Sequence, residues 1–342
     1  GMTTLLEYLP RAWKRRFEMK GLGINQKILP VRYAHPNGDV IRVDATPPGG
    51  GPPGSDPAYL AEDLCERHGV ARAILNSLEA TNMAVALADP DESVQLVAAY
   101  NDFYLEQWLP ADPRFRYALV VSPYDPQAAA AEIRRIGGRD GVVGVSLPLL
   151  NVPMGNRYYD PIYAAAQELE LPVLVHPTGT ECVYAGSPVF AGGQPQTYIE
   201  RYVIFPQVAQ TNVASLILNG VFERFPRLKV VFVELGFSWA VPLMWRMDTS
   251  WNELRVEVPW VKRRPSEYLR EHIRLTTQPV DEPERQEDLD ALIEGYLADV
   301  LVFSSDYPHW DNDMPGSVFR TLKAETQQKI FAENAAATFP RL

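Results

Sequence analysis

The sequence is short of cysteine and of long apolar runs. Its 342 residues include two cysteines, Cys65 and Cys182, which are too few for a disulfide framework. We therefore expect a reduced, cytoplasmic setting. The sequence also lacks a run of eighteen apolar residues, so no membrane span is expected.

Basic residues are outnumbered as well. With 32 Lys and Arg against 43 Asp and Glu, the formal net charge is −11. This disfavours nucleic acid and anionic membranes as partners, because both attract a basic face. Glycine-rich phosphate motifs and the G-x-S-x-G pattern are missing too, so nucleotide cofactors and serine hydrolase chemistry have no support. An apolar content of 46% still suffices for a large core, and we expect a small molecule as the partner.

Short apolar runs alternate with segments of helical apolar periodicity. The candidate strands are residues 40–45, 71–75, 117–122, 142–147, 172–176, 230–234, 273–277 and 300–304. Strands separated by helices pair in parallel through right-handed crossovers. Eight such units predict an α/β fold, a closed (β/α)8 TIM barrel, rather than a doubly wound sheet.

Residues 1–38 are predicted to form a helical extension ahead of the barrel of residues 39–342. Apolar spacing in residues 5–20 predicts one or two short amphipathic helices interrupted at Pro10, which pack against the body or a partner subunit. Two insertions, residues 46–56 and 177–197, follow predicted strands. The prolines and glycines of the first indicate a loop at the mouth of the site, and the second is either another such loop or a plain surface loop.

Titratable side chains stand at the ends of several predicted strands. His176 ends the fifth strand, Glu234 ends the sixth, and Asp306 follows the eighth, with His309 beyond it. Inward side chains at the carboxyl ends of barrel strands converge on one cleft, so we expect these groups to face each other. An imidazole and two carboxylates suit a divalent ion, zinc first, and we predict His176, Glu234 and Asp306 as its ligands. The predicted catalytic acids and bases are Asp306, Glu234 and His309.

Three further residues are candidates for substrate binding. The Arg246 guanidinium suits a substrate carboxylate, although an ion pair in the barrel wall is an equal alternative. Trp239 and Trp310 offer aromatic surface for substrate stacking or for subunit packing. Asp44, at the end of the first predicted strand, either faces the cleft or caps a turn.

Four segments resemble the amidohydrolase superfamily, and within it amidohydrolase family 2, which includes the aminocarboxymuconate-semialdehyde decarboxylase-like enzymes. They are LPVLVHPTG (171–179), FPRLKVVFVELGFSWAVPLMWRMD (225–248), LVFSSDYPH (301–309) and KIFAENA (329–335). The resemblance runs from about residue 39 to the C-terminus. It implies the same barrel, a homodimer, and a catalytic divalent metal held by the strand-five histidine and the strand-eight aspartate, here His176 and Asp306.

The sequence departs from this family at two strand ends. Family members carry His-x-His or an acid-x-His variant after strand one, where this chain reads DATPP (44–48). The decarboxylases carry a catalytic histidine after strand six, where this chain has Glu234. A metal site therefore needs substitute ligands, for which Glu234, His309 and Asp44 are the candidates.

Three functions stay open on the sequence alone. The first is a metal-dependent hydrolase or decarboxylase acting on a small carboxylated substrate, aromatic or not. The second is a metal-free acid/base enzyme of the same fold. The third is a non-catalytic ligand-binding barrel, against which the retention of four titratable groups at one face argues.

Overall fold

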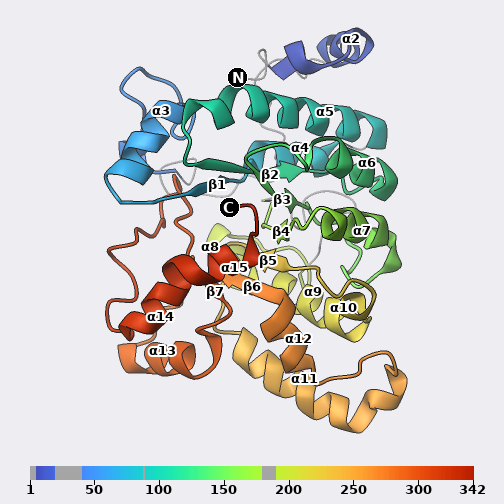
Figure 1. Ribbon diagram of the computed structural model, residues 1–342, viewed down its shortest axis with the longest axis vertical. Coiled ribbons are helices and arrows are strands. Elements are labelled where there is room, and N and C mark those ends of the chain that lie inside the picture. Colours follow the sequence, from blue (N-terminus) through green and yellow to red (C-terminus); the bar gives the residue numbers. More distant parts are fainter. Residues whose placement is uncertain (1–4, 20–40, 88, 179–189) are drawn as a thin grey trace.

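A computed structural model of the protein describes residues 5–19, 41–87, 89–178 and 190–342. Its centre is a parallel sheet of seven strands that pair in chain order (Figure 1). Each strand is short and largely buried, as expected for a sheet with both faces covered. The strands are β1 (Ala73–Leu75), β2 (Phe115–Val120), β3 (Val142–Ser146), β4 (Val173–Val175), β5 (Val230–Phe232), β6 (Ile273–Thr276) and β7 (Leu301–Val302).

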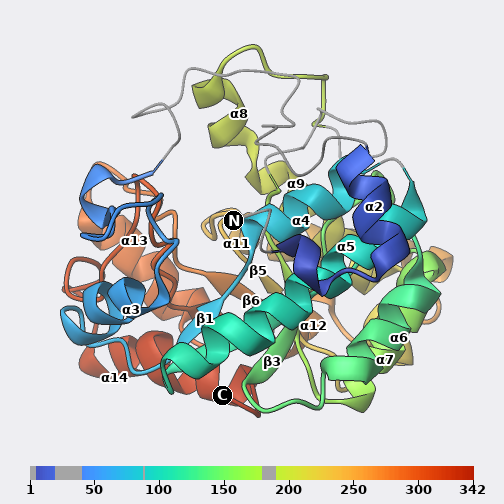
Figure 2. The same ribbon diagram turned by 90° about the horizontal axis from the view of Figure 1, so that it is seen from above.

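Helices surround the sheet (Figures 1 and 2). Those of eight or more residues in the body are α4 (Leu78–Ala86), α5 (Pro90–Phe103), α6 (Pro126–Ile136), α7 (Asp160–Glu168), α9 (Pro206–Leu218), α11 (Ala240–Leu254) and α12 (Pro265–His272). The shorter ones are α3 (Pro57–Leu60), α8 (Tyr198–Ile204), α10 (Val221–Arg224), α13 (Gln286–Leu292), α14 (Ala324–Gln328) and α15 (Asn334–Thr338). Within the described ranges, none of these helices has the length and apolar character needed to cross a bilayer.

An Asp-Pro pair begins three of these helices. Asp56, Asp89 and Asp125 each accept two backbone N–H groups of the first turn of α3, α5 and α6. The following proline has no N–H of its own and its backbone is already set for a helix. The sequence therefore fixes where these helices begin.

Seven of the eight predicted strands are confirmed, with ends that differ by a few residues. The first predicted strand, residues 40–45, is not formed: residues 41–45 make no strand of the sheet, and residue 40 lies outside the described residues. Ile41 forms an isolated antiparallel bridge with His309, and a single 3-10 turn follows it. The Arg42 N–H donates to the Pro308 carbonyl at 2.9 Å, so the loop after β7 holds this stretch and the sheet does not.

Alternate strand positions fill the inside of the curled sheet. Because side chains along a strand alternate between faces, Leu174 and His176 point to the same side. Leu174 belongs to a buried cluster that includes Ala118, Val143, Val231 and Phe339. The apolar interior and the first site residue are therefore built on one face of β4.

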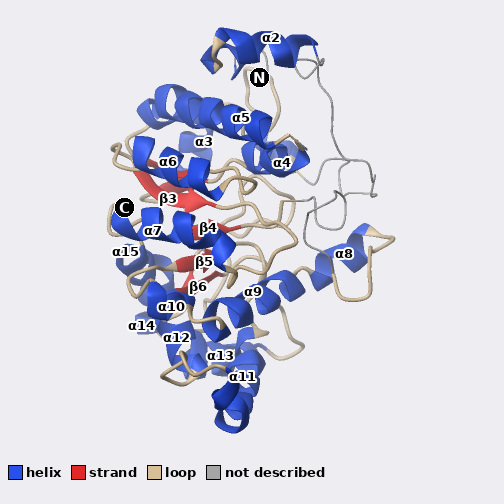
Figure 3. Cartoon of the chain, turned by 90° about the vertical axis from the view of Figure 1, so that its right-hand side faces the viewer, coloured by secondary structure: helices blue, strands red, loops and turns tan. Residues whose placement is uncertain are grey.

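The N-terminal residues form a 3-10 turn (Leu6–Tyr8) and helix α2 (Arg11–Met19), separated at Pro10 as predicted. Phe17 of α2 is fully buried in an apolar cluster with side chains of α4 and α5. Figures 1 and 3 show α2 outside the main body, beyond α5. Residues 20–40 lie outside the described residues, so the boundary between residues 1–38 and 39–342 stays a prediction.

Asn101 ties α5 to the sheet through a fully buried side chain. Its amide nitrogen donates to the Val120 carbonyl at 2.9 Å and to Glu132 at 2.7 Å. Its oxygen accepts from the Tyr117 hydroxyl and the Val120 N–H, both at 2.9 Å. Every hydrogen-bonding position of this amide is thus in use.

Replacing Asn101 with leucine is expected to lower the free energy of unfolding by roughly 2–4 kcal/mol, because several buried polar groups lose their partner. Asn252→Leu, on an exposed part of α11, is the control and should change it by less than about 0.5 kcal/mol. Urea denaturation followed by circular dichroism measures both values. Equal effects of the two changes would contradict the role given to Asn101.

Candidate active site

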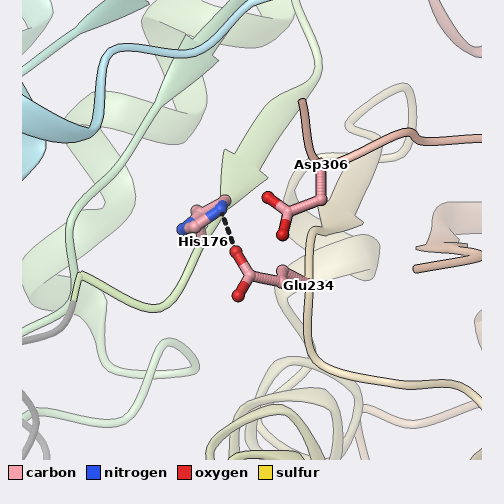
Figure 4. Close-up of side chains that lie close together, drawn as sticks. All are labelled: His176, Glu234 and Asp306. Carbon is pink, nitrogen blue, oxygen red and sulfur yellow. Dashed lines mark ion pairs between the residues drawn. The ribbon is translucent and has the colours of Figure 1, made fainter. Parts of the chain in front are cut away.

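Three side chains converge beyond the carboxyl ends of β4, β5 and β7. His176, Glu234 and Asp306 each offer one ligand atom, and these atoms all lie within 4.8 Å of one another (Figure 4). Their side chains are only 7%, 11% and 9% exposed. The structure thus brings together the three residues predicted as metal ligands.

The two ring nitrogens of His176 have different partners. Nδ1 lies 2.6 Å from the Pro177 carbonyl and donates its proton there, so Nε2 faces Glu234 Oε2 at 2.7 Å. A lone pair on Nε2 would repel the carboxylate, so a contact of this length requires a proton between the two atoms. Burial disfavours the imidazolium, but the Glu234 charge outweighs it and raises the pKa of His176. Burial likewise opposes the Glu234 carboxylate, but the contact with His176 lowers its pKa.

Glu234 and Asp306 share an uncommon backbone conformation. Both have φ of 56°, in the left-handed region that costs a non-glycine residue about 1–2 kcal/mol. The Glu234 N–H donates to Thr276 Oγ1 at 3.0 Å, which helps to hold this turn. Strained residues of this kind concentrate at functional sites.

Asp306 also pairs with His309. His309 Nδ1 lies 2.7 Å from Asp306 Oδ1. Burial and the neighbouring Glu234 charge raise the pKa of Asp306 to about 7. Burial opposes the charged form of His309, but the hydrogen bond and charge of Asp306 raise its pKa to about 9. Near neutral pH the pair therefore keeps a proton on His309.

The residues present fit a divalent metal ion. Asp306 Oδ2 is buried and has no hydrogen-bond partner in the part of the chain that the structure describes. One imidazole nitrogen and two carboxylate oxygens are ligands that zinc and manganese both accept, and three protein ligands leave room for substrate. Asp44 is not brought into this cluster: its side chain is 72% exposed and bound by Arg42 at 2.7 Å.

Two of the predicted substrate-binding residues lie at another surface. Trp239 and Arg246 line an open pocket of about 770 Å³, which none of the three clustered residues lines. The Trp239 indole N–H donates to the Leu235 and Gly236 carbonyls, which fixes the ring at the start of α11. Substrate binding by Trp239 and Arg246 stays a prediction. The other lining residues are Gln210, Pro242, Leu243, Trp245 and Thr249.

Trp310 lies beside α8, in a group of residues that the sequence pattern does not single out. The rings of Trp310 and Tyr202 are 6.3 Å apart, and the Tyr202 hydroxyl donates to Asp311. Gln278, fully buried after β6, donates to the same carboxylate at 3.0 Å. Only the helical spacing of aromatic residues after the second insertion hints at this arrangement. Residues 179–189 of that insertion lie outside the described residues.

Comparison with known proteins now gives the family. The family model Amidohydro_2, described as amidohydrolase, matches residues 35–341. The chain therefore belongs to the amidohydrolase family. A curated relative is the gamma-resorcylate decarboxylase of Rhizobium radiobacter, 27% identical over 292 residues that cover 81% of this chain and 85% of that protein.

Solved structures share the fold. The 2,6-dihydroxybenzoate decarboxylase complexed with 2,6-dihydroxybenzoate has a TM-score of 0.63 at 23% identity, over 81% of this chain and 86% of that one. The dihydroxybenzoic acid decarboxylase of a Polaromonas species, with bound manganese and the inhibitor 2-nitroresorcinol, has a TM-score of 0.62 at 22% identity, over 81% and 83%. At these identities the likeness establishes the α/β barrel fold expected from the sequence.

We expect the protein, loaded with manganese or zinc, to hold close to one ion per chain in elemental analysis. A variant with His176→Ala and Asp306→Ala should hold far less, because two of three ligands are gone. Asp44→Ala removes an exposed carboxylate outside the cluster and serves as the control, which should keep the ion. Wild-type protein with far less than one ion per chain after loading would contradict the metal site.

The affinity for manganese should fall as the pH is lowered from about 8 to about 6. The metal must displace the proton between His176 and Glu234, and Asp306, with a pKa raised to about 7, gains a proton over this range. For each proton displaced, the dissociation constant should rise about tenfold per pH unit. Calorimetric titration at several pH values measures it, and a flat profile would show that no proton competes with the ion.

Proposed function

We propose that this protein is a metal-dependent decarboxylase of a small aromatic carboxylate. The observation that carries the proposal is the convergence of His176, Glu234 and Asp306 within 4.8 Å at the carboxyl ends of barrel strands. It is supported by membership of the amidohydrolase family and by relatives that are named decarboxylases of dihydroxybenzoates. Hydrolysis is an alternative reaction for this site, because it uses the same groups on a different substrate.

The clustered residues and His309 have different roles in this proposal: the first hold the ion, and His309 transfers a proton. An ion held by His176, Glu234 and Asp306 would polarise the substrate oxygens near the breaking bond. As carbon dioxide leaves, the electron pair of the broken C–C bond stays on the ring carbon, which then takes up a proton. His309, charged and held through Nδ1 by Asp306, is the group that supplies this proton.

We further propose zinc as the resident ion, with manganese as the alternative. The imidazole ligand suits zinc, whereas the two carboxylates suit manganese equally well. A relative that binds manganese supports the alternative.

A homodimer and a cytoplasmic setting complete the proposal. The exposed apolar side chains of Trp245, Leu254 and Val256 on and after α11 offer a surface for a second copy of the chain. Cys65 is a free, buried thiol, which is common in proteins of a reduced compartment.

A metal-free acid/base enzyme is the second candidate. His176 with Glu234, and His309 with Asp306, already form two acid–base pairs at 2.7 Å each. Such pairs set carboxylates and imidazoles at different pKa values, which is what acid/base catalysis without a metal requires.

Conversion of 2,6-dihydroxybenzoate to resorcinol and carbon dioxide, followed by liquid chromatography, tests both candidates. Asp306→Asn should lower kcat at least about a hundredfold and His309→Gln by roughly 10²–10⁴, whereas Asp44→Asn should leave it unchanged. Treatment with chelator should abolish turnover, and added manganese or zinc should restore it.

Turnover that survives complete removal of metal would favour the metal-free candidate. Hydrolysis of amide or ester substrates, with no release of carbon dioxide from a panel of hydroxybenzoates, would overturn the decarboxylase proposal and leave the amidohydrolase site in place.

A further inference from the structure

The stretch ahead of α3 lies against the loop that follows β7. We call residues 41–54 the clamp segment and residues 306–312 the Asp306 loop. Figures 1 and 2 show the blue chain of the clamp segment beside the orange-red chain after β7. The Arg42 N–H donates to the Pro308 carbonyl at 2.9 Å, so the two segments are joined through their backbones.

The Asp306 loop depends on contacts from outside the sheet. It carries both Asp306 and His309, and it follows β7, which pairs only with β6 in the sheet that the structure describes. Asp306 has a φ of 56°, a conformation that persists in a residue other than glycine only where the surrounding structure holds it. On the side away from the sheet, Ile41 of the clamp segment forms an antiparallel bridge with His309.

The Arg42 side chain extends along the same loop. Its guanidinium lies over the Tyr307 ring, 5.8 Å from the ring centre. Asn312, with its amide turned so that both of its groups have partners, accepts from Arg42 Nη1 at 3.3 Å and donates to the His309 carbonyl at 3.1 Å. Arg42 is only 18% exposed in its side chain, and it contacts the loop on both sides of His309.

Gly54 packs the far end of the clamp segment on Pro308. A Cβ atom at this position would lie 3.2 Å from Pro308 Cγ and 3.5 Å from Cδ, so only a residue without a side chain fits here. Its φ of 73° also favours glycine. One glycine of the first insertion is thus explained by its contact with the Asp306 loop.

Asp44 binds the same guanidinium but is open to solvent. It accepts from Arg42 Nε at 2.9 Å and from Nη2 at 2.7 Å, and its side chain is 72% exposed. Ion pairs with an exposed partner contribute little. The contacts that hold the Asp306 loop are therefore the others made by Arg42, and the site does not need Asp44.

We infer that Arg42 is a positioning residue for Asp306 and His309. It acts through the Asp306 loop and offers no atom to the cluster that would hold the ion. Family members are expected to carry two metal ligands after strand one, whereas this chain uses the same stretch to hold a ligand that comes from another strand. The role rests on the proposed function, because His309 is taken as the group that supplies the proton.

Calorimetric titration with manganese tests this role without any turnover. Arg42→Met removes the guanidinium but keeps an apolar stem near Tyr307. Asp306 is then held less firmly, so the Kd for manganese should rise about tenfold. Arg42→Lys keeps the positive charge without the planar fork and should recover part of the affinity.

Arg263→Met is the matched control. Arg263 also lies over a tyrosine ring, that of Tyr268, and it also pairs with one carboxylate, that of Glu271 at 2.6 Å. Neither partner belongs to the clamp segment or to the Asp306 loop. The Kd for manganese should therefore stay the same in this variant.

Gly54→Ala tests the contact between the two segments and leaves Arg42 in place. The added methyl group would crowd Pro308 and displace the Asp306 loop, so the Kd for manganese should rise about fivefold. Gly69→Ala is its control, because Gly69 has a φ of 69° and open space around it. This variant has the same backbone strain without the contact, and the Kd should change less than about twofold.

Turnover of 2,6-dihydroxybenzoate at saturating manganese separates positioning from substrate binding. In Arg42→Met, kcat should fall about tenfold to a hundredfold, because His309 is less well aligned. KM should change less than about threefold, since Arg42 is not assigned to the substrate. A role limited to folding stability would lower the unfolding temperature and leave both kcat and the Kd for manganese unchanged well below it.

A Kd for manganese that rises equally in Arg42→Met and Arg263→Met, or in neither, would overturn the inference, as would wild-type protein that binds no manganese. An unchanged kcat in Arg42→Met would overturn the part that concerns His309. If Arg42→Met does not fold, equal Kd values in the two glycine variants would overturn the inference. Wild-type protein that binds manganese but releases no carbon dioxide would overturn the proposed reaction, and a rise in Kd confined to the Arg42 and Gly54 variants would still uphold the positioning of Asp306.

Discussion

Two carboxylates buried side by side set the conditions for the rest of the site. Glu234 follows β5 and Asp306 follows β7, and the side chains of both are only about a tenth exposed. Two like charges in such a place are stable only with positive charge beside them. His176 contacts one carboxylate and His309 contacts the other, each at 2.7 Å. The site is therefore built to hold cations, whether these are protons or a metal ion.

Residues 41–45 differ from what the family resemblance leads us to expect after strand one. Where two ligands after strand one are usual, residues 41–45 contain no histidine and form no strand. They bind the loop after β7 instead: Ile41 bridges His309, and the Arg42 guanidinium lies 5.8 Å from the centre of the Tyr307 ring. This segment contacts the loop that carries His309 and contributes no residue to the cluster of His176, Glu234 and Asp306. One imidazole and two carboxylates form a set of groups that both zinc and manganese accept.

Elements outside the sheet lie beside the strand ends that carry the site. The barrel fixes the acids and histidines through strand ends, which are rigid because each strand pairs with its neighbours. Helix α8 meets the loop after β7 through the hydrogen bond from Tyr202 to Asp311 and the contact of the Tyr202 and Trp310 rings. In such folds the strand ends hold the reacting groups rigidly, and the loops around them vary. One fold can therefore act on many substrates.

The sequence by itself determined the repeating strand and helix, seven of the strands, and the strand ends that carry His176, Glu234 and Asp306. These follow from local periodicity, because apolar runs report burial and the first polar residue after a run reports the edge of the sheet. Only the tertiary structure decided that residues 41–45 leave the sheet, that Asp44 faces solvent, and that α8 meets a loop 109 residues further along. Such contacts join segments that are far apart in the sequence, so a local pattern of residues does not predict them.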